Sequence, residues 1–146
     1  MARDFHLSNF LPYLLNQAAE QASQKFAAVY RAEYGLQRTD WRVLAHLGEF
    51  GKLSAREICD RAGEHKTRVS RAVSRLEEMG IIYRAASRSD RRKEVLELTI
   101  RGLRIYGELT ELAKKADEEF AEQLGASDSQ ALKATLSKLA RLHATG

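Results

Sequence analysis

Residues 54–76 read SAREICDRAGEHKTRVSRAVSRL, and the order of features in this stretch decides the fold. Ser54 and Glu57 have the spacing of a capping box, which predicts the start of a short helix. Gly63 ends that helix in a turn, and a second helix is predicted over residues 66–79. Apolar residues at i, i+4 and i+7 predict one buried edge of the second helix, formed by Val69, Val73 and Leu76, with Ala72 beside it. This pattern predicts a helix-turn-helix, with an ordinary corner of two helices as the alternative.

The face of the second helix opposite that edge is basic and rich in hydrogen-bond donors. Its residues are Lys66, Thr67, Arg68, Ser70, Arg71, Ser74 and Arg75. In helix-turn-helix proteins the second helix lies in the major groove of DNA, where Arg, Ser and Thr side chains reach the edges of the bases. The composition of this face therefore fits a DNA-reading helix, and a solvated basic face is the competing interpretation.

Two strand-like runs follow the second helix. Ile81–Ala85 and Glu94–Leu98 are short and mostly apolar, and the loop between them, Ser87–Lys93, is polar and charged. Two short strands around such a loop predict a β-hairpin. A basic hairpin tip directly after the second helix can reach the adjacent minor groove, and this favours the helix-turn-helix over the plain corner.

Positive charge is concentrated in this part of the chain. From His65 to Lys93 there are nine basic and three acidic side chains, a local charge of +6, whereas the whole chain carries +4. The remainder is therefore slightly acidic. Positive charge concentrated in one segment is typical of a nucleic-acid contact surface, although a solvated basic face would give the same excess of basic side chains.

Long amphipathic segments lie on both sides of the charged stretch. The first helix is predicted over residues 9–34, with Asn9 as its cap and Pro12 in its first turn, and its length is on the order of 35 Å. A shorter helix follows, capped by Thr39 and ended by Gly51. Because so long a first helix extends past the core of a small domain, we expect it to pack on another surface.

Two more helices are predicted toward the C-terminus. Thr99 caps the first of them, whose apolar residues repeat every three or four positions until Gly125. Ser127 and Gln130 have capping-box spacing and open the last helix. Together these signals predict a mainly α fold class with a small β-hairpin wing.

Three stretches resemble the multiple antibiotic resistance regulator (MarR) family: Glu57–Leu76, LEEMGIIYR over 76–84, and SDRRKEVLELTIRG over 89–102. The last is similar to the family's wing signature, an Asp followed two residues later by an Arg, then a strand that ends in Leu-Thr and a Gly three residues further on. The order of helices is similar too, so the resemblance covers nearly the whole chain. His65 is a departure, because a small capping residue is more usual there.

The resemblance implies a sequence-specific transcription regulator that binds double-stranded DNA. Arg92 would enter the minor groove at the wing tip, where an ion pair with Asp90 would hold it. Contacts to the major groove and to phosphates would come from Lys66, Thr67, Arg68, Ser70, Arg71 and Arg75, and the predicted set includes Arg88 and Arg91 of the wing. Within this set we predict that Arg68 and Arg71 read bases.

The family also implies a homodimer. Independently, the terminal helices carry more apolar surface than one small winged domain can cover, so a partner surface is needed. We therefore predict a helical dimerisation region, residues 1–34 and 100–146, and a winged helix-turn-helix DNA-binding region, residues 35–99, in one intertwined unit. Two copies would place the second helix of each helix-turn-helix, residues 66–79, in successive major grooves about 10 base pairs apart, on a roughly palindromic operator.

A small-molecule effector is a further expectation from the resemblance. Similar proteins are often released from DNA by small aromatic acids bound between the dimerisation helices and the winged domain. Candidate lining residues are Tyr13, Tyr30, Trp41 and His46, with His6 as a further one. For each of them an ordinary core or surface role is the alternative. The expected function is a repressor that a small aromatic or carboxylate effector releases from its operator.

Other chemistry finds little support in the sequence. Cys59 is the only cysteine. We predict that it is a buried, inert thiol and not a peroxide sensor, because the peroxide-sensing cysteine of some similar proteins lies in their first helix. The four histidines, His6, His46, His65 and His143, lack metal-ligand spacing, and there is no nucleophile motif or phosphate-binding loop. We therefore expect no enzyme activity, cofactor or metal.

Two expectations remain. No apolar run approaches the roughly 20 residues of a membrane span, so a cytoplasmic protein with no membrane partner is predicted. A winged helix that mediates protein assembly without nucleic acid is an alternative function for the same fold. The arginine-rich loop argues against that alternative.

Overall fold

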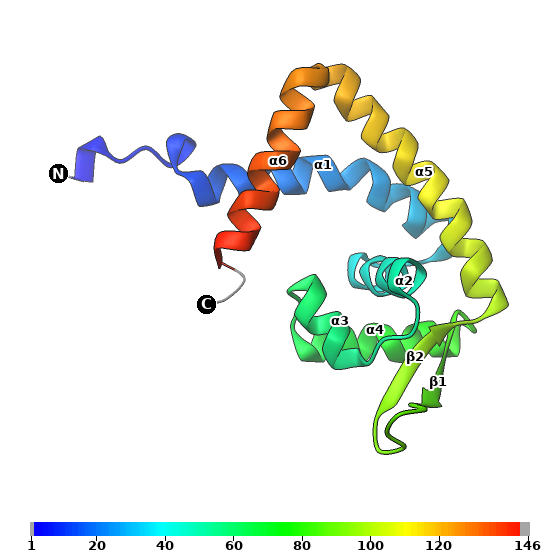
Figure 1. Cartoon of the computed structure of the whole chain (residues 1–146). Coiled ribbons are helices and arrows are strands. Elements are labelled where there is room, and N and C mark those ends of the chain that lie inside the picture. Colours follow the sequence, from blue (N-terminus) through cyan, green and yellow to red (C-terminus); the bar gives the residue numbers. More distant parts are fainter. Residues whose placement is uncertain (1, 144–146) are drawn as a thin grey trace. The chain divides into compact units, whose positions relative to one another are not determined.

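The computed structural model describes residues 2–143, which form six α-helices, two short 3-10 helices and one two-stranded hairpin (Figure 1). The predicted fold class is confirmed. The bounds are α1 Leu11–Tyr34, α2 Arg38–Phe50, α3 Ala55–Ala62, α4 Lys66–Glu78, β1 Ile82–Ala86, β2 Glu94–Leu98, α5 Ile100–Leu124 and α6 Ala126–His143. Residues 1 and 144–146 of the predicted dimerisation region, and the side chain of His143, lie outside this description.

The chain divides into two compact units, residues 1–109 and 110–146. In the first unit α2, α3, α4 and the hairpin share one apolar core. The predicted apolar edge of α4 is buried: Val69 and Leu76 are fully buried, and Val73 is 2% exposed. Other core residues are Val43, Leu44 and Leu47 from α2, Ile58 from α3 and Leu96 from β2. Because α4 buries one stripe, its opposite face stays at the surface.

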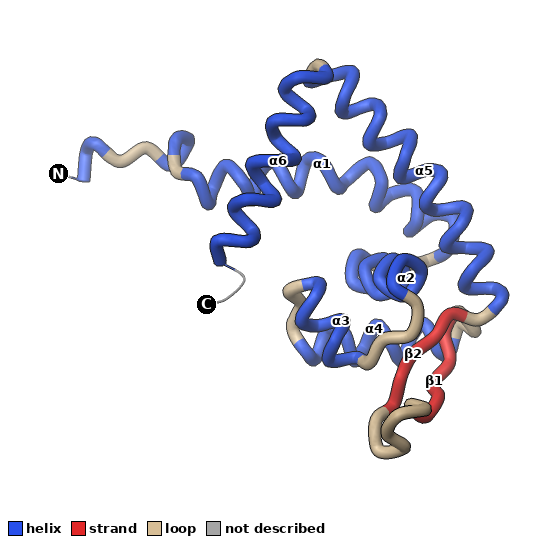
Figure 2. The backbone as a smooth tube through the Cα atoms, in the orientation of Figure 1, coloured by secondary structure: helices blue, strands red, loops and turns tan. Residues whose placement is uncertain are grey.

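The hairpin is antiparallel, with Ile82 opposite Leu98 and Ala86 opposite Glu94 (Figure 2). Leu53, just before α3, forms a bridge to this hairpin. Its backbone N–H donates to the carbonyl of Leu96 at 3.3 Å, and the N–H of Leu96 donates back at 2.8 Å. The bridge attaches the start of the helix-turn-helix to the wing.

Thr99, at the start of α5, contacts the segment that follows α4. The Thr99 hydroxyl donates to the carbonyl of Gly80 at 2.6 Å and accepts a hydrogen bond from the N–H of Gly102 at 3.0 Å, so the predicted cap of α5 is confirmed. A Cβ added to Gly102 would lie 2.1 Å from the carbonyl oxygen of Ile81. The backbones therefore approach too closely at this point for any residue other than glycine.

The predicted cap of α1 is wrong. The helix begins at Leu11, with Phe10 as its N-cap, and Asn9 belongs to the separate 3-10 helix Leu7–Asn9. The tight turn of this 3-10 helix, closed by hydrogen bonds to residues three positions earlier, takes the chain through Asn9 before α1 starts. Pro12 does lie in the first turn, as predicted.

The predicted cap of α2 is also wrong by two positions. The helix begins at Arg38, so Thr39 already lies inside it, and Gln37 is the N-cap. The backbone N–H of Gln37 donates to the carboxylate of Asp40 at 2.8 Å. The Asp40 side chain thus pairs a backbone N–H at the start of α2, and the Thr39 hydroxyl is not needed as a cap.

The second unit contains the C-terminal part of α5 and all of α6. Gly125, at φ 89°, turns the chain, and α6 starts directly at Ala126. Ser127 therefore lies in the first turn of α6, and the predicted capping box with Gln130 is wrong. The ammonium of Lys133 is 2.5 Å from the carboxylate of Asp117 and links the two helices. Within residues 2–143, no helix is long and apolar enough to span a membrane.

Candidate DNA-binding surface

Local hydrogen bonds set the start of α3. The Ser54 hydroxyl accepts from the backbone N–H of Glu57 at 3.1 Å, and the Glu57 carboxylate accepts from the N–H of Ser54 at 3.1 Å. The predicted capping box is thus confirmed. The hydrogen bond from the Ser54 backbone holds the pKa of Glu57 below its ordinary value.

The turn between α3 and α4 follows the sequence prediction. Gly63 has φ 64°, a left-handed conformation that favours glycine. His65 then caps α4, because its Nδ1 accepts a hydrogen bond from the N–H of Thr67 at 3.4 Å. The unusual cap residue therefore performs the capping role, and α4 begins at Lys66.

The outward face of α4 is exposed. The exposed residues of the predicted set are Lys66, Thr67, Arg68, Ser70 and Arg71. Among residues 2–143 no ion pair involves Lys66, Arg68 or Arg71. The charges of these three side chains are therefore available to a ligand from solvent.

Arg75, the last member of that set on α4, has a structural partner. Its Nη2 lies 2.8 Å from Oδ1 of Asp40, and its Nε lies 3.1 Å from the same oxygen. Asp40 is 1% exposed, whereas the Arg75 side chain is 36% exposed. The ion pair between Arg75 and Asp40 therefore joins α4 to α2. Part of the Arg75 side chain remains exposed at the surface.

The wing loop is closed by its own backbone. The N–H of Ser87 donates to the carbonyl of Lys93 at 2.8 Å, and the N–H of Lys93 donates to the carbonyl of Asp90 at 3.0 Å. Arg88, Arg91 and Arg92 are all exposed. The loop thus holds three arginines at the surface of the wing.

Asp90 contacts Arg92 differently from the implied ion pair. Its Oδ1 accepts a hydrogen bond from the backbone N–H of Arg92 at 3.0 Å. Within the described part of the chain, the side chains of these two residues form no ion pair. The reason is geometric: a short Asp side chain bonds readily to the N–H two residues later. Asp90 therefore shapes the loop and leaves the Arg92 guanidinium unpaired.

Arg84 connects the wing to α4. Its Nε lies 3.2 Å from the Glu77 carboxylate on α4, and its Nη1 lies 2.8 Å from the Glu94 carboxylate on β2. These contacts are partly exposed, so their energy is small. They nevertheless join the two elements on which the predicted DNA contacts lie.

The four predicted effector residues do not gather at one place. Tyr30 is buried and stacks on Trp41, with ring centroids 6.2 Å apart. His46 follows Trp41 by five residues, which places it about 140° further around α2, and its Nδ1 lies 2.6 Å from the carbonyl of Arg42. Tyr13 lies on α1, about 25 Å along the helix from Tyr30. His6 is exposed in the N-terminal segment.

Cys59 is half-buried, whereas the sequence predicted a buried thiol. It lies on α3 next to Ile58, which is fully buried. The short helix turns Cys59 away from the core because Ile58 occupies the apolar stripe.

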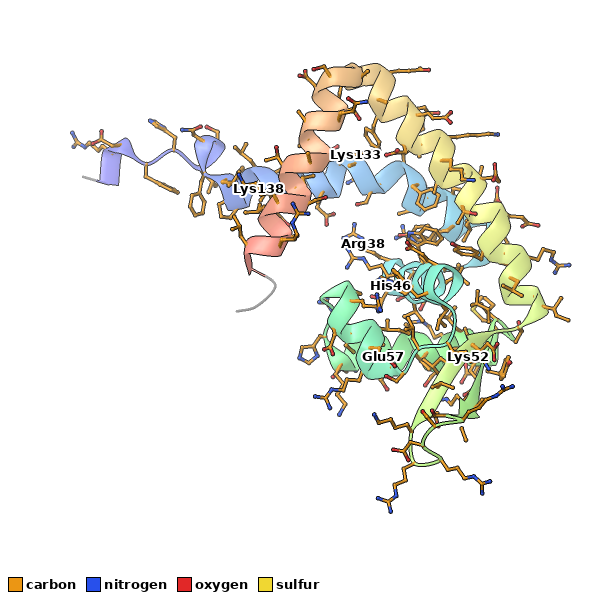
Figure 3. The ribbon with its side chains drawn as sticks, viewed as in Figure 1. Arg38, His46, Lys52, Glu57, Lys133 and Lys138 are labelled. Carbon is orange, nitrogen blue, oxygen red and sulfur yellow. The ribbon has the colours of Figure 1, made fainter. Side chains whose placement is uncertain are left out.

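The fold brings together one group of residues whose proximity was not predicted from the sequence. A cavity of about 430 Å³ opens between α1, α2 and α4. We call it the arginine pocket, because its lining includes Arg31, Arg38, Arg42, Arg68, Arg71 and Arg75. Figure 3 shows Arg38 at the beginning of α2. The i, i+4 spacing of Arg38 and Arg42 was the available signal, but their proximity to α4 depends on the tertiary fold.

Comparison with known proteins gives matches to one family. Residues 34–93, from the end of α1 to the end of the wing loop, match the profile of the MarR family. A solved MarR family transcriptional regulator from Silicibacter pomeroyi is 28% identical, with a TM-score of 0.83, and the match covers 95% of this chain and 98% of that one. The winged helix-turn-helix region of the chain thus matches the MarR family, and the whole chain is similar to a transcriptional regulator of that family.

Two further similar proteins match over most of their length. The HTH-type transcriptional regulator FarR of Neisseria gonorrhoeae is 27% identical over 128 residues, which is 88% of this chain and 87% of FarR. The structure of NadR in complex with 4-hydroxyphenylacetate is 25% identical, with a TM-score of 0.79, over 92% of this chain and 94% of NadR. FarR and the Silicibacter pomeroyi protein are both named as transcriptional regulators.

Proposed function

We propose that this protein is a homodimeric repressor of the MarR family that binds a palindromic operator and is released by a small-molecule effector. The observation that carries the proposal is the pair of exposed basic surfaces in one compact unit. The outward face of α4 and the wing loop both present arginines without an ion-pair partner among the described residues. A duplex offers phosphates and groove edges to both.

The residues divide into two roles. Arg68 and Arg71 read bases in the major groove, and their neighbours Lys66, Thr67, Ser70 and Arg75 contact bases or phosphates. In the wing, Arg92 enters the minor groove while Arg88 and Arg91 contact the backbone. Asp90 contributes by fixing the backbone N–H of Arg92.

Exposed apolar side chains support the dimer. In the predicted dimerisation region, residues 1–34 and 100–146, the exposed large apolar residues are Phe5, Leu7, Phe10, Leu11, Leu14, Ile100, Leu103, Leu124, Leu132, Leu136 and Leu142. In the predicted winged region they are Phe50 and Tyr83. Apolar surface on this scale is unfavourable in water, and a second copy would cover it.

An effector would act on the junction of α1 and α2. The NadR structure holds 4-hydroxyphenylacetate, a small aromatic acid. In this chain Phe26, Tyr30 and Trp41 form an aromatic cluster at that junction, with Phe26 and Trp41 centroids 5.1 Å apart. We propose that Tyr30 and Trp41 form the apolar wall of an effector site, and that Tyr13 and His46 lie outside it.

Selection of bound fragments from the source genome tests this function. Fluorescence anisotropy should then give nanomolar binding to a selected palindrome, with affinity falling steeply as salt rises. Weak binding that is indifferent to sequence would contradict it. No binding even at low salt would favour a protein-assembly module with the same fold.

A further inference from the structure

The arginine pocket is strongly positive. Six arginines from three helices line it, and among its described lining residues Glu64 is the acidic one. Asp40, the buried partner of Arg75, does not belong to the lining. Like charges gathered around one cavity repel each other, and this repulsion is relieved when an anion enters.

Half of these arginines already have partners. Arg38 lies 3.0 Å from the Glu20 carboxylate, Arg42 contacts Glu64, and Arg75 contacts Asp40. The remaining three, Arg31, Arg68 and Arg71, have no ion pair among residues 2–143. The pocket therefore presents three uncompensated guanidinium groups, one from α1 and two from α4.

This arrangement selects for a particular class of ligand. A guanidinium has a planar fork of donors that matches the oxygens of a phosphate or carboxylate. Three such groups match a ligand with two or more negative charges, and each phosphate group carries about −1.5 to −2 at neutral pH. An aromatic monocarboxylate would leave two guanidinium groups unmatched. The volume of about 430 Å³ is large enough for a small metabolite.

We propose that the arginine pocket binds a small phosphorylated molecule with at least two negative charges, and that this binding weakens DNA binding. The ligand would occupy Arg68 and Arg71, which the proposed function assigns to base reading, so the second part of the proposal rests on that function. The pocket adjoins the aromatic cluster, because Tyr30 belongs to its lining and stacks on Trp41, whereas Phe26 and Trp41 do not line it. A backbone phosphate of DNA offers the same chemistry, and the experiment distinguishes the two sources.

The first arm measures anion binding without DNA. Inorganic pyrophosphate is titrated into the full chain by calorimetry at constant ionic strength. We expect one site per chain, at least tenfold weaker in Arg31→Gln and Arg68→Gln and unchanged in Arg101→Gln, an exposed arginine of α5 outside the pocket. Equal binding by all four proteins, or no binding, would overturn the proposal.

Thermal unfolding gives an independent reading on the same samples. Pyrophosphate should raise the Tm of the wild type and of Arg101→Gln but not of Arg31→Gln. The Tm values without pyrophosphate show whether each variant is folded. Arg31 has no ion pair to lose, so its substitution should leave that Tm within about 2 °C.

The second arm adds operator DNA and uses anisotropy. Pyrophosphate at constant ionic strength should weaken DNA binding by the wild type at least tenfold and by Arg31→Gln less than threefold. If Arg31→Gln instead lowers the salt slope by about one and pyrophosphate does not bind the free protein, the pocket holds a DNA phosphate and the proposal fails. If DNA binding itself is absent, the calorimetric arm still decides whether the pocket takes the anion.

Discussion

The guanidinium of Arg75 on α4 and the buried carboxylate of Asp40 on α2 form a two-point contact, at 2.8 Å through Nη2 and 3.1 Å through Nε. The same carboxylate accepts the N–H of Gln37 at 2.8 Å. Asp40 thus fixes both the start of α2 and the position of α4 relative to α2. Together with the buried apolar residues of the two helices, this side chain sets the orientation of the exposed basic face of α4.

Asp40→Asn should destabilise the protein by about 2 kcal/mol. Removal of one partner from a buried pair costs about 3–5 kcal/mol, and exposed pairs contribute about 0.2–1 kcal/mol, so a pair with one exposed member lies between them. Urea unfolding measures the change. An unchanged midpoint, within about 0.5 kcal/mol, would show that the contact does not hold α4 in place.

Gly102→Ala should destabilise the protein by about 3 kcal/mol, because the new Cβ would collide with the backbone of Ile81. Gly107→Ala on the same helix is the matched control, since a Cβ there meets nothing within 4 Å. That substitution should stabilise by about 0.5–1 kcal/mol. Similar unfolding midpoints for the two variants would contradict the close approach.

The hydroxyl of Tyr34 should ionise at a higher pH than an ordinary tyrosine. Its hydroxyl donates a hydrogen bond to the Glu108 carboxylate, and this contact, with burial, raises the pKa of Tyr34 to about 12 from its ordinary value of 10.0. Because the folded pKa is the higher one, the contact stabilises the fold fully below pH 10 and loses this effect as pH rises toward 12. In an absorbance titration, Tyr34→Phe should remove a component that ionises near pH 12. Loss of a component near pH 10 instead would contradict the contact.

Arg71→Ala and Arg92→Ala should weaken operator binding for different reasons. Loss of a base-reading arginine costs about 1–3 kcal/mol and relaxes specificity at one position. Loss of a minor-groove arginine weakens binding more evenly across sequences and reduces the salt slope by about one. Anisotropy over a salt series separates these effects, with Arg101→Ala as the control that should change neither. Identical profiles for the two variants would argue against separate roles.

Features that depend on neighbouring residues were predictable from the sequence. The Ser54–Glu57 capping box, the Gly63 turn and the Thr99 cap all depend on groups within three residues, and all three formed as predicted. The apolar edge of α4 followed from helical periodicity alone. Such local signals fixed the helix-turn-helix and the order of the elements.

Features that depend on the path of the incoming chain were not predictable. Asn9 and Thr39 are good capping residues, but the chain enters α1 through a 3-10 turn and enters α2 through the Gln37–Asp40 contact. Asp40 itself carries no local sign that it is buried, because its partner Arg75 is 35 residues away. The arginine pocket has the same origin, since its residues come from separate helices.

Hydroxyl-radical footprinting on a selected operator tests the central claim most directly, namely that the arginines of α4 and of the wing meet the same duplex in a paired molecule. The wild type should protect two half-sites about 10 base pairs apart, each flanked by a protected stretch of minor groove. In Arg92→Ala the flanking protection should disappear while the half-sites remain. A single half-site, or flanks that stay protected without Arg92, would contradict this account.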